Sequence, residues 1–268
     1  MIIRAIKGPL VAGFGANVSC IDFTTDIDYM LLADGAQTGL DLLGGDFTLE
    51  GWIYSFGLGS PAGGARFVPM IKNGLTGAWT NNRQWGVQVG YTTTPPHNYY
   101  VSAHCSEDGA ADDTVTWGQA TGAGEIFPVN DWMHFALTCD ISEAVADQFT
   151  LYLDGVDQGA SLVSGNAGAT AIFDGAAGVC VGGYNYDPAI VGFLGRFRGD
   201  EFRVWNYART LSQINDNMSK RIDPTSPGLI CYPRMDDNAG TTATDSTSNG
   251  NDFPFFGSPS WVTSPLPF

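Results

Sequence analysis

The sequence predicts an all-β fold, a sandwich of two antiparallel sheets with one short helix. The chain has 35 glycines and 14 prolines and is only 15% charged, which is typical of many short strands joined by tight turns. Glu and Lys, which favour exposed helices, are scarce, and most acids are Asp, which favours turns. Several segments also alternate with the period of two that a strand requires.

The clearest alternation lies in residues 47–54, where Phe47, Leu49 and Ile53 share one face and Trp52 and Tyr54 the other. Residues 131–139 alternate in the same way. Further strands are expected at 18–23, 26–32, 67–72, 85–91, 99–105, 179–184 and 201–205. No internal repeat is evident, which disfavours a propeller or solenoid.

Two local signals predict how strands are connected. Asp154-Gly155 stands between the apolar runs 149–153 and Val156, and Asp-Gly in that position strongly indicates a hairpin. Thr210 followed by Gln213 fits a capping box at a helix start. We therefore expect a helix over residues 211–218, with Leu211 and Ile214 packed on the sheet.

The chain divides into an N-terminal arm or edge strand (1–20), a sandwich (21–262) and a Pro-rich tail (263–268). Prolines forbid regular ladder pairing, so the tail is expected to lie extended over the surface or to reach a neighbour. Residues 1–14 and 258–268 are the predicted places for contacts between subunits.

Charge narrows the possible partners. The net charge of −16 argues against a nucleic-acid surface and is compatible with neutral glycans, divalent cations or a basic protein. The alternative is that the negative charge only keeps an extracellular or virion surface soluble. Residues 1–7 lack the apolar core of a signal peptide, and no run reaches transmembrane length, so we expect cytoplasmic synthesis without cleavable signal or membrane insertion.

The cysteine count is odd, and no two cysteines form a C-x-x-C pair. Each cysteine lies in an apolar, strand-like segment, so buried free thiols are the first expectation, with disulfides left open. The five are Cys20, Cys105, Cys139, Cys180 and Cys231.

Five segments, in this order, carry a resemblance to a known family: 47–54 (FTLEGWIY), 131–138 (DWMHFALT), 151–155 (LYLDG), 197–214 (FRGDEFRVW, then ARTLS and Ile214) and 235–252 (MDDNAGTTATDSTSNGND). Together they resemble the laminin-G-like, concanavalin A-type family. The fourth departs from the family pattern because Gly199 and Asp200 are adjacent.

The resemblance extends from about Phe23 to Trp261 and implies a jelly-roll sandwich that mostly binds rather than catalyses. In many relatives the last segment precedes the others, so its position here implies a permuted closure of the same sandwich. The first 20 residues and the Pro-rich end match nothing in the family pattern.

A calcium site is the first functional hypothesis, because calcium takes six to eight oxygens from carboxylates, amides and carbonyls. The resemblance implies that the acid near Tyr29 and the acids of the 245–252 turn approach one another. The alternative is that these residues only close turns by bonding their own backbone. The candidate ligands are Asp26, Asp28, Asp200, Asp245, Asn249 and Asp252.

A glycan-binding face is the second hypothesis, because sugars stack on aromatic rings and bond their hydroxyls to polar side chains. The alternative for each ring is packing, which is also how Trp52, Trp132 and Trp205 are interpreted. The candidate glycan-binding residues are Trp79, Asn82, Trp85, Tyr91, Tyr99, Tyr184 and Tyr186.

Catalysis finds little support, and no catalytic residue is predicted. The Glu-x-Asp-x-x-Glu strand of related glucanases is absent, and His134 lies mid-strand, where a packed imidazole is expected. No nucleophile elbow, phosphate loop or zinc spacing occurs.

The sequence therefore predicts a non-enzymatic surface module that acts in structure or recognition. The lack of a signal peptide beside an extracellular type of fold favours a virus or phage particle protein, a capsid decoration or a fibre, that contacts other virion proteins or its own copies and binds surface glycans. The alternatives are a free carbohydrate-binding lectin and a glycoside hydrolase.

Overall fold

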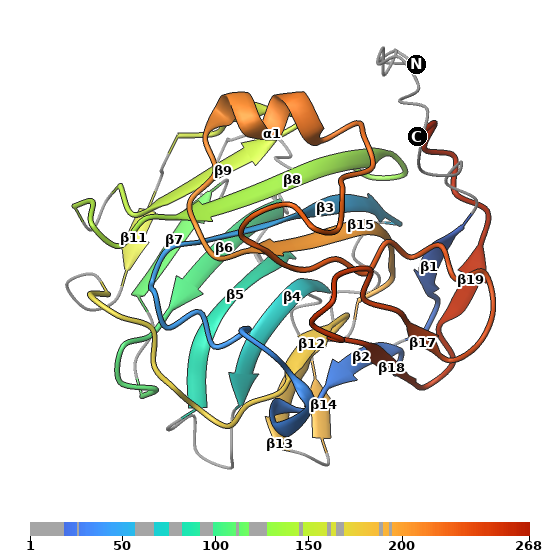
Figure 1. The fold of residues 1–268 in the computed structure, drawn as a ribbon, viewed down its shortest axis with the longest axis horizontal. Helices are drawn as coiled ribbons and strands as arrows, with labels where there is room; N and C mark the ends of the chain where they lie inside the picture. Colours follow the sequence, from blue (N-terminus) through green and yellow to red (C-terminus); the bar gives the residue numbers. More distant parts are fainter. Residues whose placement is uncertain are drawn as a thin grey trace.

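The computed structural model describes residues 19–25, 27–56, 67–74, 82–91, 99–110, 113–117, 128–144, 147–159, 162–164, 169–187, 190–192 and 195–268. Within these residues the chain forms two sheets packed face to face and a short α-helix (Figure 1). The predicted all-β jelly-roll sandwich is confirmed. Residues 1–18 of the predicted N-terminal arm lie outside the described part.

The first sheet has eight strands, and all of its pairs are antiparallel. In spatial order they are β10 (Val156–Asp157), β9 (Phe149–Leu153), β8 (Trp132–Cys139), β3 (Phe47–Ser55), β15 (Phe197–Trp205), β1 (Cys20–Phe23) and β19 (Ser260–Val262), while β16 (Leu229–Cys231) pairs with β15. The predicted hairpin at Asp154-Gly155 joins β9 to β10.

The second sheet has eleven strands. In order they are β11 (Leu162–Ser164), β7 (Asp113–Trp117), β6 (Tyr99–Cys105), β5 (Asn82–Tyr91), β4 (Phe67–Gly74), β12 (Val179–Val181), β2 (Tyr29–Leu32), β18 (Phe253–Phe256) and β17 (Thr242–Ala243). The hairpin of β13 (Tyr184–Asp187) and β14 (Ile190–Gly192) joins β4 through one parallel pair, and a 3₁₀ turn, η1 (Asp34–Ala36), follows β2.

The core lies between the sheets because each strand directs every second side chain inward. Stacked rings cross the interface between the sheets. The ring centroid of Phe67 in the second sheet lies 5.1 Å from that of Phe197 in the first, and the Phe197 centroid lies 4.6 Å from that of Phe23. Such pairs contribute about 0.5–1.5 kcal/mol beyond their buried area. All five cysteines are buried and free, as predicted.

Helix α1 (Leu211–Asn217) lies on the outer face of the first sheet (Figure 1). It begins with the predicted capping box, in which the Thr210 hydroxyl accepts from the Gln213 N–H at 3.3 Å and the Gln213 side chain accepts from the Thr210 N–H at 2.8 Å. Ile214 is buried beneath it, but Leu211 is 40% exposed, so the expectation that both pack inward was wrong for Leu211.

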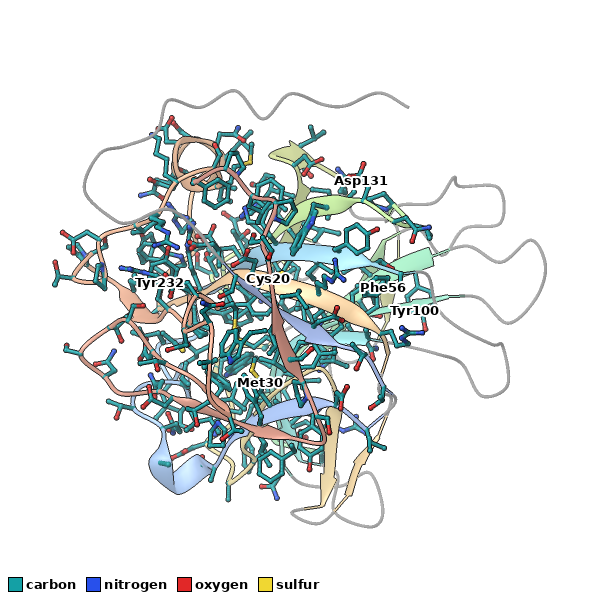
Figure 2. All side chains as sticks on the ribbon, turned by 90° about the vertical axis from the view of Figure 1, so that its right-hand side faces the viewer. Cys20, Met30, Phe56, Tyr100, Asp131 and Tyr232 are labelled. Carbon is teal, nitrogen blue, oxygen red and sulfur yellow. The ribbon has the colours of Figure 1, made fainter. Side chains whose placement is uncertain are left out.

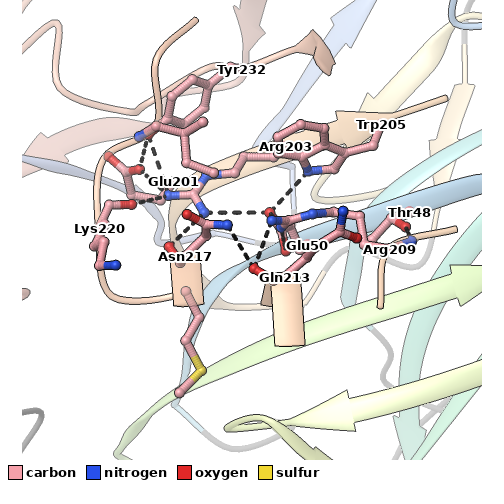
Figure 3. A network of polar contacts seen from close by, with 12 residues as sticks. Thr48, Glu50, Glu201, Arg203, Trp205, Arg209, Gln213, Asn217, Lys220 and Tyr232 are labelled. Atoms are coloured by element: carbon pink, nitrogen blue, oxygen red, sulfur yellow. Dashed lines mark hydrogen bonds and ion pairs between the residues drawn. The ribbon is translucent and has the colours of Figure 1, made fainter. Parts of the chain in front are cut away.

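A buried charge network (Glu50, Glu201, Arg203, Arg209 and Tyr232) joins this face of the sheet to the chain that covers it (Figure 3). Glu50 is 1% exposed and accepts two hydrogen bonds from Arg209, at 2.7 and 2.8 Å. Arg203 donates to Glu201 at 2.8 Å. Burial would raise the pKa of Glu50, but the Arg203 and Arg209 guanidiniums outweigh it and hold that pKa below its usual value.

The same face of the sheet satisfies the carbonyls at the end of α1, which have no partner inside the helix. Arg203 donates to the carbonyls of Asn217 at 3.2 Å and of Lys220 at 2.6 Å. The indole of Trp52 donates to the carbonyl of Met218 at 2.8 Å. The helix therefore depends on side chains of β3 and β15.

The C-terminal tail (residues 263–268) covers the neighbouring part of this face. The Ser264 hydroxyl donates to Asp200 at 2.6 Å, and Leu266 and Phe268 are buried in a cluster with Trp52. The tail thus lies extended over its own sandwich, the first of the two predicted alternatives. The predicted contacts between subunits at 258–268 need correction for Leu266 and Phe268, because both are buried against the first sheet.

Removing Glu50 should strongly destabilise the fold. Glu50→Ala leaves Arg203 and Arg209 buried without their shared carboxylate, and breaking a buried pair in this way costs about 3–5 kcal/mol. Urea denaturation measures the change, with the exposed Glu143→Ala as the matched control. A loss below about 1 kcal/mol would show that the network does not hold the helix to the sheet.

His134, on the outer face of β8, gives a second stability prediction. It is 1% exposed, and neither ring nitrogen has a hydrogen-bond partner among the residues that the structure describes. Burial, assisted by the guanidiniums of Arg203 and Arg209, lowers its pKa to about 3. The folded protein therefore keeps His134 neutral where the unfolded chain protonates it, so stability is lost as the pH falls below about 6.5.

Replacing this imidazole by a hydrocarbon should remove both the cost of burying unpartnered ring nitrogens and the loss of stability at low pH. We expect His134→Leu to raise the free energy of unfolding by about 1 kcal/mol at pH 7, because an unsatisfied buried group is removed. Between pH 6 and pH 4 the difference from wild type should grow by up to about 1.4 kcal/mol per pH unit. Urea denaturation at pH 4, 5, 6 and 7 measures it, and parallel pH profiles would contradict the assignment.

Candidate functional site

One end of the outer face of the first sheet is covered by neither α1 nor the tail. Five side chains meet there and form what we call the aromatic–arginine site. Trp132 starts β8, Tyr54 lies near the end of β3 with Phe56 just after that strand, and Arg198 lies near the start of β15 with Arg196 just before it. Arg196 is exposed and the other four are half-buried. The site is therefore partly open to solvent.

Strand register brings these residues together. Tyr54 pairs with Trp132 on one side and with Arg198 on the other. Phe56 and Arg196 lie two residues farther along the chain in each direction, so the period of two places them on the same face. Figure 2 shows Phe56 at one end of the sandwich and Tyr232, of the buried charge network, at the other.

The three rings form a continuous aromatic surface. The Tyr54 ring centroid lies 5.8 Å from that of Trp132 and 5.1 Å from that of Phe56. Trp132 also packs against the cluster of Trp52, Leu266 and Phe268 under the tail. The tail thus supports one side of the site and restrains the Trp132 ring, so the surface exists before any ligand arrives.

The two guanidiniums lie against these rings. The Arg198 Cζ atom is 5.0 Å from the Phe56 centroid and 5.7 Å from the Tyr54 centroid, and the Arg196 Cζ atom is 5.6 Å from the Phe56 centroid. These distances are within the range of cation–π attraction. Asp22, the register partner of Arg198 on β1, accepts a hydrogen bond from Arg198 Nε at 2.8 Å. Both arginines are therefore positioned by their neighbours.

Two more features bear on what this site can do. Asp131 is exposed beside Trp132, and its carboxylate accepts from the Trp132 N–H at 2.9 Å, so an acceptor lies at the rim. Half-exposed rings with charged hydrogen-bonding groups around them are suited to binding a molecule with an apolar face and a polar edge. The five side chains offer stacking surfaces and hydrogen-bonding groups.

The buried charge network is poorly suited to catalysis. Glu50 and Glu201 are each 1% exposed and both are ion-paired with Arg203, so a substrate cannot reach them. Their role is to hold the covering chain on the sheet. Among the described residues, these two carboxylates carry structural charge and do not form an acid and base pair for glycoside cleavage.

Two of the predicted glycan-binding residues, Trp85 and Asn82, have described side chains, and neither belongs to the aromatic–arginine site. Trp85 is fully buried in the core, and its indole N–H donates to the Leu40 carbonyl at 2.8 Å, so the prediction that its ring stacks on a sugar needs correction. Asn82 is half-buried and its side chain accepts from the Ala176 N–H at 3.2 Å.

The remaining glycan candidates stay predictions. Tyr91 and Tyr99 are register partners on β5 and β6, and Tyr184 and Tyr186 lie on β13. Their side chains, and the whole of Trp79, lie outside what the structure describes.

The candidate calcium ligands are used mainly to close turns. Asp28 accepts from the backbone N–H groups of Thr24 at 2.9 Å, Thr25 at 2.8 Å and Ser258 at 2.7 Å. It therefore joins the turn after β1 to the chain after β18. This matches the alternative that the sequence left open, in which these acids bond backbone groups.

The 245–252 turn is built in the same way. Asp245 accepts from the N–H groups of Tyr232 at 2.8 Å and Asn251 at 2.9 Å, and Asp252 accepts from the Asp245 N–H at 2.8 Å. Asn249 donates to the Ile230 carbonyl at 2.9 Å.

Asp200 accepts from Ser264 in the tail, whereas Asp26 lies outside the described residues. Across the described ranges, no three His, Cys, Asp or Glu side chains are grouped so as to hold a metal ion.

Calcium binding stays a prediction, and a chelator tests it. If the six candidate residues hold an ion that binds only the folded chain, excess calcium should raise the melting temperature and EDTA should lower it. Differential scanning calorimetry with magnesium as the control ion measures this. Identical melting temperatures in calcium and EDTA would contradict the calcium hypothesis.

Comparison with known proteins identifies the class. A model of the concanavalin A-like lectin/glucanases superfamily, Laminin_G_3, matches residues 27–215, most of the chain. The chain belongs to this superfamily, as the ordered segments of the sequence implied. A search of curated proteins found no match. No helix among the described residues is long and apolar enough to cross a bilayer.

Solved structures share the fold at low identity. A candidate carbohydrate-binding protein from Bacteroides ovatus has a TM-score of 0.60 and 18% identity, over 95% of this chain and 62% of its own. A heptameric SAP-like pentraxin from Limulus polyphemus has a TM-score of 0.53 and 10% identity, over 93% of this chain and 97% of its own. This chain thus spans less than two thirds of the Bacteroides protein.

A phage protein is a more distant structural neighbour. The enzymatically active domain of tailspike protein 2 from bacteriophage CBA120 has a TM-score of 0.49 and 13% identity, over 82% of this chain and 30% of its own. A likeness of this degree bears on neither the function nor the location of the present chain.

Sequence reasoning missed most of the aromatic–arginine site. It named neither arginine, and it interpreted Trp132 as a core residue, whereas Trp132 is half-buried. The one available signal was the alternation in 47–54, which places Tyr54 on the face opposite Phe47 and Leu49. The signal is incomplete because the sequence of one strand does not determine the register between strands, and it is register that pairs Tyr54 with Trp132 and Arg198.

Proposed function

We propose that this chain is a non-enzymatic carbohydrate-recognition module and that the aromatic–arginine site is its binding surface. The observation that carries the proposal is the half-exposed Tyr54–Trp132 pair on the outer face of a rigid sheet, with charged groups at its edge. Membership of a lectin-type superfamily supports it. The fold of the Bacteroides protein is consistent with it.

The surface of the aromatic–arginine site matches the surface of a sugar ring. One face of a sugar ring presents C–H groups, which pack on aromatic rings, while its hydroxyls require hydrogen-bond partners. Tyr54 and Trp132 supply the rings, and Asp131 and the arginines supply polar groups at the rim. Because strands and the tail already hold the rings, binding loses little side-chain entropy. An individual site of this size is weak, so useful avidity requires several copies or several sites.

We infer display outside the cell, on a virus or phage particle among other virion proteins or copies of itself, with a free lectin as the alternative. Light scattering coupled to size exclusion measures whether the chain self-associates. Capsid and tail genes beside its gene would support the particle, whereas polysaccharide-degradation genes would contradict it and favour the third alternative, a glycoside hydrolase.

Removing either ring of the Tyr54–Trp132 pair should weaken glycan binding without unfolding the chain. We expect Tyr54→Ala and Trp132→Ala each to weaken binding about tenfold or more, since about 1.4 kcal/mol of stacking is lost. A glycan array identifies the ligand and calorimetry measures affinity. Tyr152→Ala is the control, because Tyr152 is a half-buried tyrosine on β9, outside the site.

Two outcomes would contradict the proposal. In one, the array shows no binding at millimolar sugar. In the other, both ring variants keep the wild-type affinity and melting temperature, which would place the binding surface elsewhere.

A further inference from the structure

The aromatic–arginine site is unusual in this chain for its positive charge. The chain has 12 Lys and Arg against 28 Asp and Glu, so cations are scarce. Several of the cationic side chains form ion pairs within the fold. Arg203 and Arg209 pair with Glu50, Lys72 pairs with Asp34 and Asp41, and Arg221 pairs with Asp236. Two arginines side by side at a solvent-exposed position are therefore a distinct feature.

Neither guanidinium has all of its nitrogens engaged in ion pairs or hydrogen bonds with the described residues. Arg196 is exposed and has no ion pair among the described residues. Arg198 is paired with Asp22 through Nε alone, and within the described chain its two terminal nitrogens make no hydrogen bond. Those nitrogens form the part of the guanidinium fork that matches a carboxylate or another planar anion.

Phe56 and Asp22 keep the two charges in place. The Phe56 centroid lies 5.6 Å from Arg196 Cζ and 5.0 Å from Arg198 Cζ, so one ring attracts both cations. Two like charges beside one ring repel each other, and Asp22, with a side chain only 6% exposed, offsets just one of them. An anion bound at their exposed side would relieve the remaining repulsion.

We propose that the site recognises an anionic saccharide. Arg196 and Arg198 hold its carboxylate or sulfate group, and its ring lies on Tyr54 and Trp132. This inference rests on the proposed carbohydrate function and adds the substrate class. The net charge of −16 repels anions at long range, so a preference for an acidic sugar requires a local group of positive charges, which this pair supplies.

Direct comparison of charged and uncharged forms of one sugar tests the inference. Trigalacturonic acid and its fully methyl-esterified form have the same rings, and only the first is negatively charged. Calorimetry should show at least tenfold tighter binding of the acid. An array that pairs sulfated with unsulfated saccharides distinguishes a sulfate from a carboxylate as the preferred group.

Variants assign the preference to the two arginines. Arg196→Gln and Arg198→Lys should each reduce the acid-to-ester affinity ratio to about threefold or less, because the affinity for the acid falls more than the affinity for the ester. Arg198→Lys keeps a positive charge beside Asp22 and removes only the planar fork, so the fold is protected. Lys220→Gln, which removes a positive charge near the buried charge network, is the control and should keep the ratio.

The outcomes separate this inference from the function on which it rests. Equal binding of acid and ester, with Tyr54→Ala still weakening both, would overturn the anionic preference and leave carbohydrate recognition standing. An acid preference that survives in both arginine variants would also overturn it. If neither trigalacturonate form nor any array saccharide binds, the proposed function itself fails.

Discussion

The rest of the structure depends on the double hydrogen bond between Arg209 and the buried carboxylate of Glu50. A carboxylate on the outer face of a central strand would normally face water, and here chain 205–234 covers it. Two guanidiniums make that burial tolerable, and the same arginines donate to the carbonyls of Gln213 and Lys220 within the covering segment. A buried network of this kind stabilises weakly in net terms, but it specifies one position for the helix.

That constraint decides which surface remains for recognition. With α1 over Glu50 and the tail over Trp52, the chain itself covers part of the outer face of β3. The uncovered end carries Tyr54, where the tail also supports Trp132. Buried charge around Glu50 and the half-buried ring of Tyr54 thus lie on the same strand, and Figure 2 shows Tyr232 of the charge network and Phe56 of the aromatic–arginine site at opposite ends of the sandwich.

Prediction from sequence succeeded where the signal is local. The hairpin at Asp154-Gly155 and the helix capped by Thr210 both formed as expected, because each depends on residues that are neighbours in the chain. Prediction failed where exposure depends on the whole fold. Trp85 looks like a loop-side aromatic in sequence, yet the packing of the second sheet buries it completely.

The sequence by itself determined the all-β class, the superfamily, the cap and turn chemistry, and the burial of the five cysteines. Only the tertiary structure decided that Asp28 and Asp245 accept backbone N–H groups and that Tyr54, Trp132 and Arg198 form one row. The reason is physical. Alternation within a strand states which face a side chain occupies, whereas register between strands distant in sequence states which side chains meet there.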